Sequence, residues 1–153
     1  AVLNQTGSLY LYDYGKNKVI KEQKIITNGN AKSVAFTQNG GDVLTGHSNG
    51  MINYWDLKFS SIKFLDSSRR EIHSGVITDM ITHPRLESIV ISLGDDNYIR
   101  FTEYNNYKIL GTIYKDSSGW VVYNKRGDYT GNRAVPEFFQ KKTRIANPFQ
   151  GMF

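Results

Sequence analysis

Internal repetition is the feature that most constrains this chain of 153 residues, because a segment recurring at a steady spacing implies one structural unit built several times. Three segments align without gaps, at offsets of 43 and 47 residues: 7–14 (GSLYLYDY), 50–57 (GMINYWDL) and 97–104 (NYIRFTEY). Each begins with Gly or Asn, the residue types that tolerate a positive φ in a tight turn. Apolar residues then recur with a period of two, which predicts a strand packed against a neighbouring layer.

A second set of segments recurs in the same way. Residues 36–40 (FTQNG), 81–85 (ITHPR) and 123–127 (YNKRG) each end an apolar strand and enter a turn, at offsets of 45 and 42 residues. A full unit therefore reads as three strands joined by turns, with a fourth strand before the next unit. For the middle unit the sequence predicts strands near 32–37, 42–47, 51–57 and 61–65.

The segment Asn49–Leu57 (NGMINYWDL) resembles the WD-repeat signature, D-G-x-I-x-x-W-D-L. The Trp-Asp pair stands at Trp55–Asp56, and the other copies have Tyr12–Asp13 and Thr102–Glu103. The repeat spacing is also close to the ~40–45 residues of WD blades. This resemblance covers about residues 1–131 and implies an all-β fold, a WD40-type β-propeller or a portion of one, with four-stranded antiparallel blades.

The aligned units divide the chain into incomplete and complete blades. The predicted parts are a half blade 1–27, blades 28–66 and 67–115, a half blade 116–131 and a C-terminal tail 132–153. Propellers close with ~4–8 blades, so we expect completion from outside these residues. An upstream part of the protein is one source, and it is favoured because Ala1 aligns with mid-strand. A homodimer, in which two chains complete one ring, is the other.

The Gly-His pair of the WD family is poorly kept. Gly46–His47 lies eight residues before Trp55, too close for the family spacing, and the matching loop position holds 28–30 (NGN) in that unit. His73 occupies this position in the next unit, but the Trp position there is Thr102. We therefore do not expect the buried hydrogen-bond network of the family in this chain.

The residue inventory argues against an enzyme. The absence of Cys excludes disulfides, thiolate metal sites and a Cys nucleophile. His47, His73 and His83 lack metal-ligating spacing, and no G-x-S-x-G elbow occurs, although a Ser–His–Asp arrangement is not excluded. His83–Pro84 is expected to form a turn. We expect no cofactor and no metal. No apolar run is long enough to span a membrane, and the cytoplasm is favoured over the periplasm.

The loop between units supplies the first candidate binding residues. Arg69, Arg70 and Glu71 lie where WD proteins usually engage partners, and Arg is enriched at interface hot spots. Asp95 and Asp96 precede the third strand of their unit, where the family favours Asp in the turn, and they do not have the ligand pattern of a calcium loop. They remain candidates as part of the same rim.

The tail supplies the second group of candidates. Lys141, Lys142 and Arg144 form a basic cluster, and Phe149 ends 147–149 (NPF), the tripeptide that EH domains bind. Three charges are few for nucleic acid, which we therefore consider an unfavoured partner. The prediction is a non-enzymatic protein–protein interaction scaffold that binds a protein through its loop rim and tail. The alternative is the propeller portion of a larger enzyme, for example a bacterial one, or of a nucleic-acid-associated complex.

Overall fold

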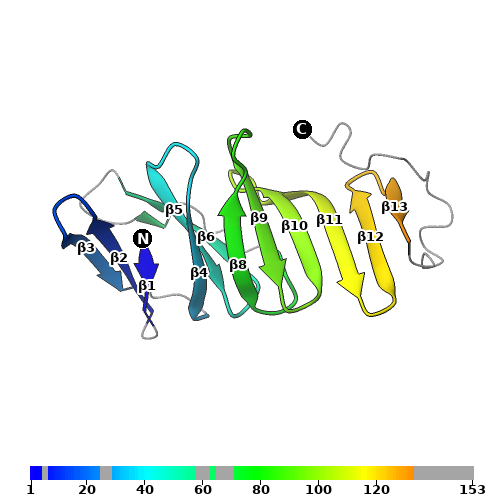
Figure 1. Cartoon of the computed structure of the whole chain (residues 1–153), viewed down its shortest axis with the longest axis horizontal. Helices are drawn as coiled ribbons and strands as arrows, with labels where there is room; N and C mark the ends of the chain where they lie inside the picture. The colour runs from blue at the N-terminus through cyan, green and yellow to red at the C-terminus, as the bar shows by residue number, and fades with distance from the viewer. Residues whose placement is uncertain (5–6, 25–28, 58–62, 65–70, 133–153) are drawn as a thin grey trace.

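All the secondary structure of the described residues is β-strand (Figure 1). The computed structural model describes residues 1–4, 7–24, 29–57, 63–64 and 71–132, with the side chains of 63–64 left aside. The strands are β1 (Val2–Leu3), β2 (Ser8–Asp13), β3 (Lys18–Lys24), β4 (Ala31–Phe36), β5 (Asp42–His47), β6 (Ile52–Asp56), β7 (Lys63–Phe64), β8 (Ile77–Thr82), β9 (Ile89–Gly94), β10 (Tyr98–Glu103), β11 (Lys108–Asp116), β12 (Gly119–Asn124) and β13 (Tyr129–Gly131). The all-β prediction is confirmed.

The strands form three antiparallel sheets. The first sheet has the order β1-β2-β3, the second sheet β4-β5-β6-β7 and the third sheet β13-β12-β11-β10-β9-β8. In Figure 1 they follow one another along the long axis, from the first sheet near the N-terminus to the third. Over the described part of the chain they do not close into a ring.

The four strands predicted for the middle unit coincide with β4, β5, β6 and β7 to within two residues at each end. The turn chemistry is also as expected. Gly7, Gly50 and Asn97, which open the three aligned segments, have φ values of 80°, 75° and 65°. At Gly50 a Cβ would lie 1.7 Å from the carbonyl oxygen of His73, so this turn position requires glycine for space as well.

The third sheet differs from the predicted division into a blade 67–115 and a half blade 116–131. β12 pairs with β11 and continues the same sheet, giving six strands in place of four. The cause is the short turn between them, in which Asp116 Oδ1 accepts hydrogen bonds from Ser118 N (2.8 Å) and Ser118 Oγ (2.6 Å). A connection of this length returns the chain alongside β11 and cannot carry it into a separate sheet.

The core lies between the sheets, and β5 is buried along its whole length because it has a sheet on either side. Val43 and Trp55 pack against Leu9 and Leu11 of the first sheet. Leu44, next to Val43, faces the opposite way and joins a cluster with residues of the third sheet, including Ile77, Met80 and Val90. Successive residues of one strand therefore stabilise two different junctions.

Candidate functional site

Three segments distant in sequence meet at one end of the second and third sheets. We call them the loop cluster: the β5–β6 turn (47–51), the loop before β8 (71–76) and the β9–β10 turn (94–97). The amides of Ile72 and His73 donate to Gly50 O at 2.9 and 3.0 Å. The Asp95 amide donates to Val76 O at 3.0 Å. These backbone bonds fix the three segments relative to one another.

The Asp96 carboxylate is the centre of the loop cluster. Its Oδ1 lies 2.9 Å from His73 Nδ1 and accepts the Tyr98 amide at 3.1 Å. Its Oδ2 accepts the Ser74 amide at 3.1 Å and Arg100 Nη1 at 2.9 Å, and Arg100 also donates to the Ile72 carbonyl. The side chain of Asp96 is only 6% exposed. One carboxylate thus ties the loop, the turn and β10 together.

His73 links this carboxylate to the interior of the third sheet. Its Nε2 lies 2.9 Å from Ser92 Oγ, and the ring is buried. Burial lowers the pKa of His73 below its usual value, although Asp96 acts in the opposite direction. Burial raises the pKa of Asp96, but hydrogen bonds from His73, Ser74 and Tyr98 outweigh it and leave this pKa lowered. A neutral imidazole that donates from Nδ1 and accepts at Nε2 satisfies both partners.

Ser92, His73 and Asp96 are connected in the order of a hydrolytic triad. A nucleophile must also meet its substrate. Ser92 lies within β9 and is 0% exposed, so its hydroxyl is not accessible from solvent. The arrangement can brace the loop against the sheet, but it cannot attack a substrate as it stands.

A related network occupies the second sheet. Trp55 Nε1 donates to Thr45 Oγ1 at 2.7 Å, and Thr45 Oγ1 lies 2.8 Å from His47 Nε2. His47 Nε2 is also 2.9 Å from Asn53 Nδ2, and His47 Nδ1 is 3.1 Å from Gly29 O. Burial lowers the pKa of His47 as well. The second sheet therefore joins its Trp to a His through a strand hydroxyl.

The two networks use the same hydroxyl position, since Thr45 and Ser92 are 47 residues apart. The histidine comes from different places. In the third sheet His73 lies in the loop over Gly94, where a Cβ would be 2.2 Å from the imidazole Nδ1. In the second sheet His47 stands on the strand at the position of Gly94, and the loop carries Gly29. Histidine and glycine have exchanged positions between the units.

The sequence did not predict either of these contacts. Gly46–His47 was not expected to be the Gly-His pair of the WD family, and the structure places His47 on β5 and not in the loop. The family's buried network was not expected around His73, yet both imidazoles are bonded to a strand hydroxyl. Sequence reasoning missed Ser92 as the partner of His73, and the hydroxyl that repeats 47 residues after Thr45 was the signal that pointed to it.

The structure brings three predicted site residues together at the loop cluster. Glu71 is exposed and forms an isolated bridge with Met51, and Asp95 is also exposed. Asp96 is buried among its internal partners. The other candidates lie outside the described residues: Arg69, Arg70, Lys141, Lys142, Arg144 and Phe149.

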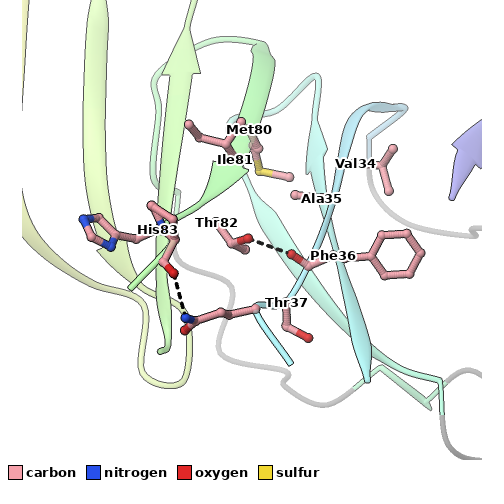
Figure 2. A pocket seen from close by; sticks show the side chains of 10 residues that line it. Val34, Ala35, Phe36, Thr37, Met80, Ile81, Thr82 and His83 are labelled. Carbon is pink, nitrogen blue, oxygen red and sulfur yellow. Dashed lines mark hydrogen bonds between the residues drawn. The ribbon is translucent and has the colours of Figure 1, made fainter. Parts of the chain in front are cut away.

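The predicted turn at His83 is confirmed, because its Nδ1 accepts the amides of Arg85 (3.2 Å) and Leu86 (3.1 Å). This turn adjoins an open groove of about 490 Å³ at the far ends of β4 and β8 from the loop cluster (Figure 2). Thr82 Oγ1 donates to Phe36 O at 2.9 Å across it, joining the two sheets. The groove is open and shallow, a surface for contact and not an enclosed ligand site.

Comparison with known proteins identifies no relative: no family model matches the chain, and no curated protein matches it. Within the described residues, no three His, Asp or Glu side chains are grouped so that they could hold a metal ion. The same part of the chain has no helix with the length and apolar character needed to cross a membrane.

Proposed function

We propose that this chain is a portion of a WD-type β-propeller and acts as a non-enzymatic scaffold that binds a protein partner at the loop cluster. The observation that carries the proposal is the buried Asp96 carboxylate, which holds loop 71–76, turn 94–97 and Arg100 in one arrangement. Loops that are already ordered lose little conformational entropy on binding. A fixed rim of loops therefore favours recognition and requires no chemistry of its own.

The family assignment is supported by features that recur with the sequence repeat. The positive-φ turns at Gly7, Gly50 and Asn97 have the spacing of the aligned segments. The His–hydroxyl–Trp chain through Thr45 and Trp55 is of the kind that the resemblance implies for a WD unit. A blade of four strands is the proposed interpretation of β4 to β7.

The exposed side chains of the loop cluster suggest the chemistry of the contact. Glu71, Ser74 and Asp95 are exposed around the buried Asp96. Carboxylates on a fixed frame favour a partner segment that offers Lys, Arg or backbone amide donors. The neighbouring Arg69 and Arg70 are proposed to add contacts to acidic groups of the same partner.

Photo-crosslinking in cells tests this surface. A photoreactive amino acid is placed at Ser74 or at Asp95, and the control places it at Asn105, an exposed residue beyond the other end of β10. We expect a discrete cross-linked protein from the first two positions and none from the third. Equal products from all three positions, or none from any, would overturn the loop cluster as the binding surface.

The tail is tested separately. Removal of residues 132–153 is expected to weaken capture of the partner identified by crosslinking, because the basic and aromatic residues proposed to contact it are lost. Unchanged capture by a truncated chain that still folds, as judged by circular dichroism, would remove the tail from the proposal.

The triad-like order of Ser92, His73 and Asp96 makes a serine hydrolase the second candidate. It is disfavoured by the full burial of Ser92. A fluorophosphonate probe is expected to leave the native chain unlabelled. Labelling that disappears in Ser92→Ala, with the fold retained, would establish the hydrolase in place of the scaffold.

A further inference from the structure

The two sheet junctions inside the chain follow one packing rule. At the first junction, Leu9 of the first sheet packs against Val43 of the second. At the next junction, Ile52 of the second sheet belongs to the same cluster as Val90 of the third. Ile52 is the aligned equivalent of Leu9, and Val90 that of Val43. The same two aligned positions therefore meet at both junctions.

The outer face of the third sheet corresponds to the face of the second sheet that packs at the second junction. Ile91 and Ile99 are aligned with Leu44 and Ile52, which are 0% and 3% exposed in the second sheet. On the third sheet the neighbouring Leu93 is 42% exposed, and it pairs with Ile99. The most extensive contacts between strands of different sheets are β4–β8, β5–β8 and β1–β4, and none of these involves β9 or β10, which carry Ile91, Leu93 and Ile99.

Four apolar side chains lie together on this outer face. Ile81 pairs with Ile91 across β8 and β9, and it is 57% exposed. A shallow depression of about 160 Å³ runs over these strands, lined mainly by Ile81, Ile91, Leu93 and Ile99 together with Asp79. We call the surface of Ile81, Ile91, Leu93 and Ile99 the trailing face.

The outer face of the first sheet corresponds to the face of the second sheet on which Trp55 packs at the first junction. Val2 pairs with Tyr10 and Tyr12 pairs with Val19 on the side opposite to Leu9 and Leu11. Val2, Tyr12 and Val19 are 55%, 43% and 51% exposed. Tyr12 is aligned with Trp55, which is 5% exposed at the first junction. We call the surface of Val2, Tyr10, Tyr12 and Val19 the leading face.

We propose that a second copy of this chain covers both surfaces, with the trailing face of each copy packed on the leading face of the other. Each copy presents outer faces that are aligned with those meeting at its own junctions, Ile91 and Ile99 with Leu44 and Ile52 on one side and Tyr12 with Trp55 on the other, so the contact continues an interface already present in the fold. Two equal head-to-tail junctions related by a two-fold axis close the assembly. The alternative dimer, in which the trailing faces of the two copies pack on each other, would bring together aligned positions that do not meet at either internal junction. This contact does not depend on partner binding at the loop cluster.

The molar mass in solution tests the proposal, measured by light scattering coupled to size exclusion from about 1 to about 100 µM. The native chain is expected to reach twice its 17.4 kDa at the upper end. Leu93→Lys on the trailing face and Val19→Asp on the leading face should each raise the dissociation constant at least about tenfold. Phe36→Lys, at a residue that is also 41% exposed but lies in the groove, is the matched control and should remain dimeric.

Mixing the two variants distinguishes the head-to-tail contact from other dimers. The mixed dimer has one junction with two native faces and a second in which the introduced lysine faces the introduced aspartate, so we expect mixing to restore the dimer. A folded native chain that stays monomeric at about 100 µM overturns the proposal. A dimer that survives Val19→Asp alone, or variants that stay monomeric when mixed, would also overturn it.

Discussion

In the third sheet, the hydrogen-bond network of Asp96, His73 and Ser92 is not extended to a Trp, because Thr102 occupies that position. It stands at the position of Trp55, whose indole N–H donates to the Thr45 hydroxyl. A threonine is too short to repeat that contact. Its Oγ1 is buried and has no hydrogen-bond partner, a state shared by no other buried side-chain polar atom in the described residues. A buried hydroxyl that lost water without gaining a partner reduces the stability of the fold.

Thr102→Val should therefore stabilise the chain, by about 1 kcal/mol, because a methyl group of the same shape needs no partner. The matched substitution Thr45→Val should destabilise it by about 1–3 kcal/mol, because it removes the hydroxyl that accepts from the buried Trp55 Nε1, while His47 Nε2 keeps its contact with Asn53 Nδ2. Urea unfolding midpoints measure both changes. Changes of the same sign in the two variants would contradict this account.

The buried histidines give the stability a defined pH dependence. The pKa values of His47 and His73 are both lowered from 6.5, mainly by burial. Below about pH 6.5 the unfolded chain binds protons that the folded chain does not. The two neutral histidines therefore do not lower the free energy of unfolding above about pH 6.5. As the pH falls below that value, the free energy of unfolding decreases by up to about 1.4 kcal/mol per pH unit for each histidine.

Urea unfolding at a series of pH values from about 7 down to about 5 measures this loss. Nitrogen chemical shifts of the two imidazoles provide the direct check, since both rings should remain neutral in the folded chain over the upper part of this range. A flat stability profile, or rings that titrate near 6.5 in the folded state, would contradict the prediction.

Sequence reasoning about single residues reached part of the candidate site. The turn chemistry of Gly50 and Asn97 was predictable because few residue types adopt a positive φ. The networks were not, because an imidazole reaches a strand hydroxyl from two different backbone positions, as His47 and His73 do. Sequence spacing indicates where the backbone of a histidine lies, but it does not indicate where its imidazole ring is placed.

Among the elements, β4, β5 and β6 were predictable from alternating apolar residues bounded by turn residues. The continuation from β11 into β12 was not. Aligned repeats placed a boundary there, but the short turn at Asp116 and Ser118 keeps the two strands paired. The local hydrogen bonds of a turn decide whether the next strand joins the present sheet or starts another, and repeat spacing does not contain that information.

The described molecule is a series of sheets in which a central strand is far more buried than an edge strand at the N-terminal end. β5 is buried on both faces, whereas β3 is an edge strand with mostly exposed side chains. Opening β3 therefore exposes little apolar surface, and opening β5 disrupts the packing on both of its neighbours.

Amide hydrogen exchange should follow this gradient. We expect the amides of β5 to exchange at least about a hundredfold more slowly than those of β3, as measured by mass spectrometry of peptides from each strand. Protection of β3 equal to that of β5 would mean that the sheets open only together, contrary to the packing described above.

The exchange of histidine and glycine between units also restricts how this repeat can be engineered. A consensus sequence averaged column by column from the two units would place histidine both in the loop and on the strand, or glycine in both. The first choice puts two imidazoles into a space where even a Cβ added at Gly94 would lie 2.2 Å from His73 Nδ1. The second leaves the strand hydroxyl without its imidazole. A designed array based on this chain must therefore inherit the loop and the strand of a unit as a pair.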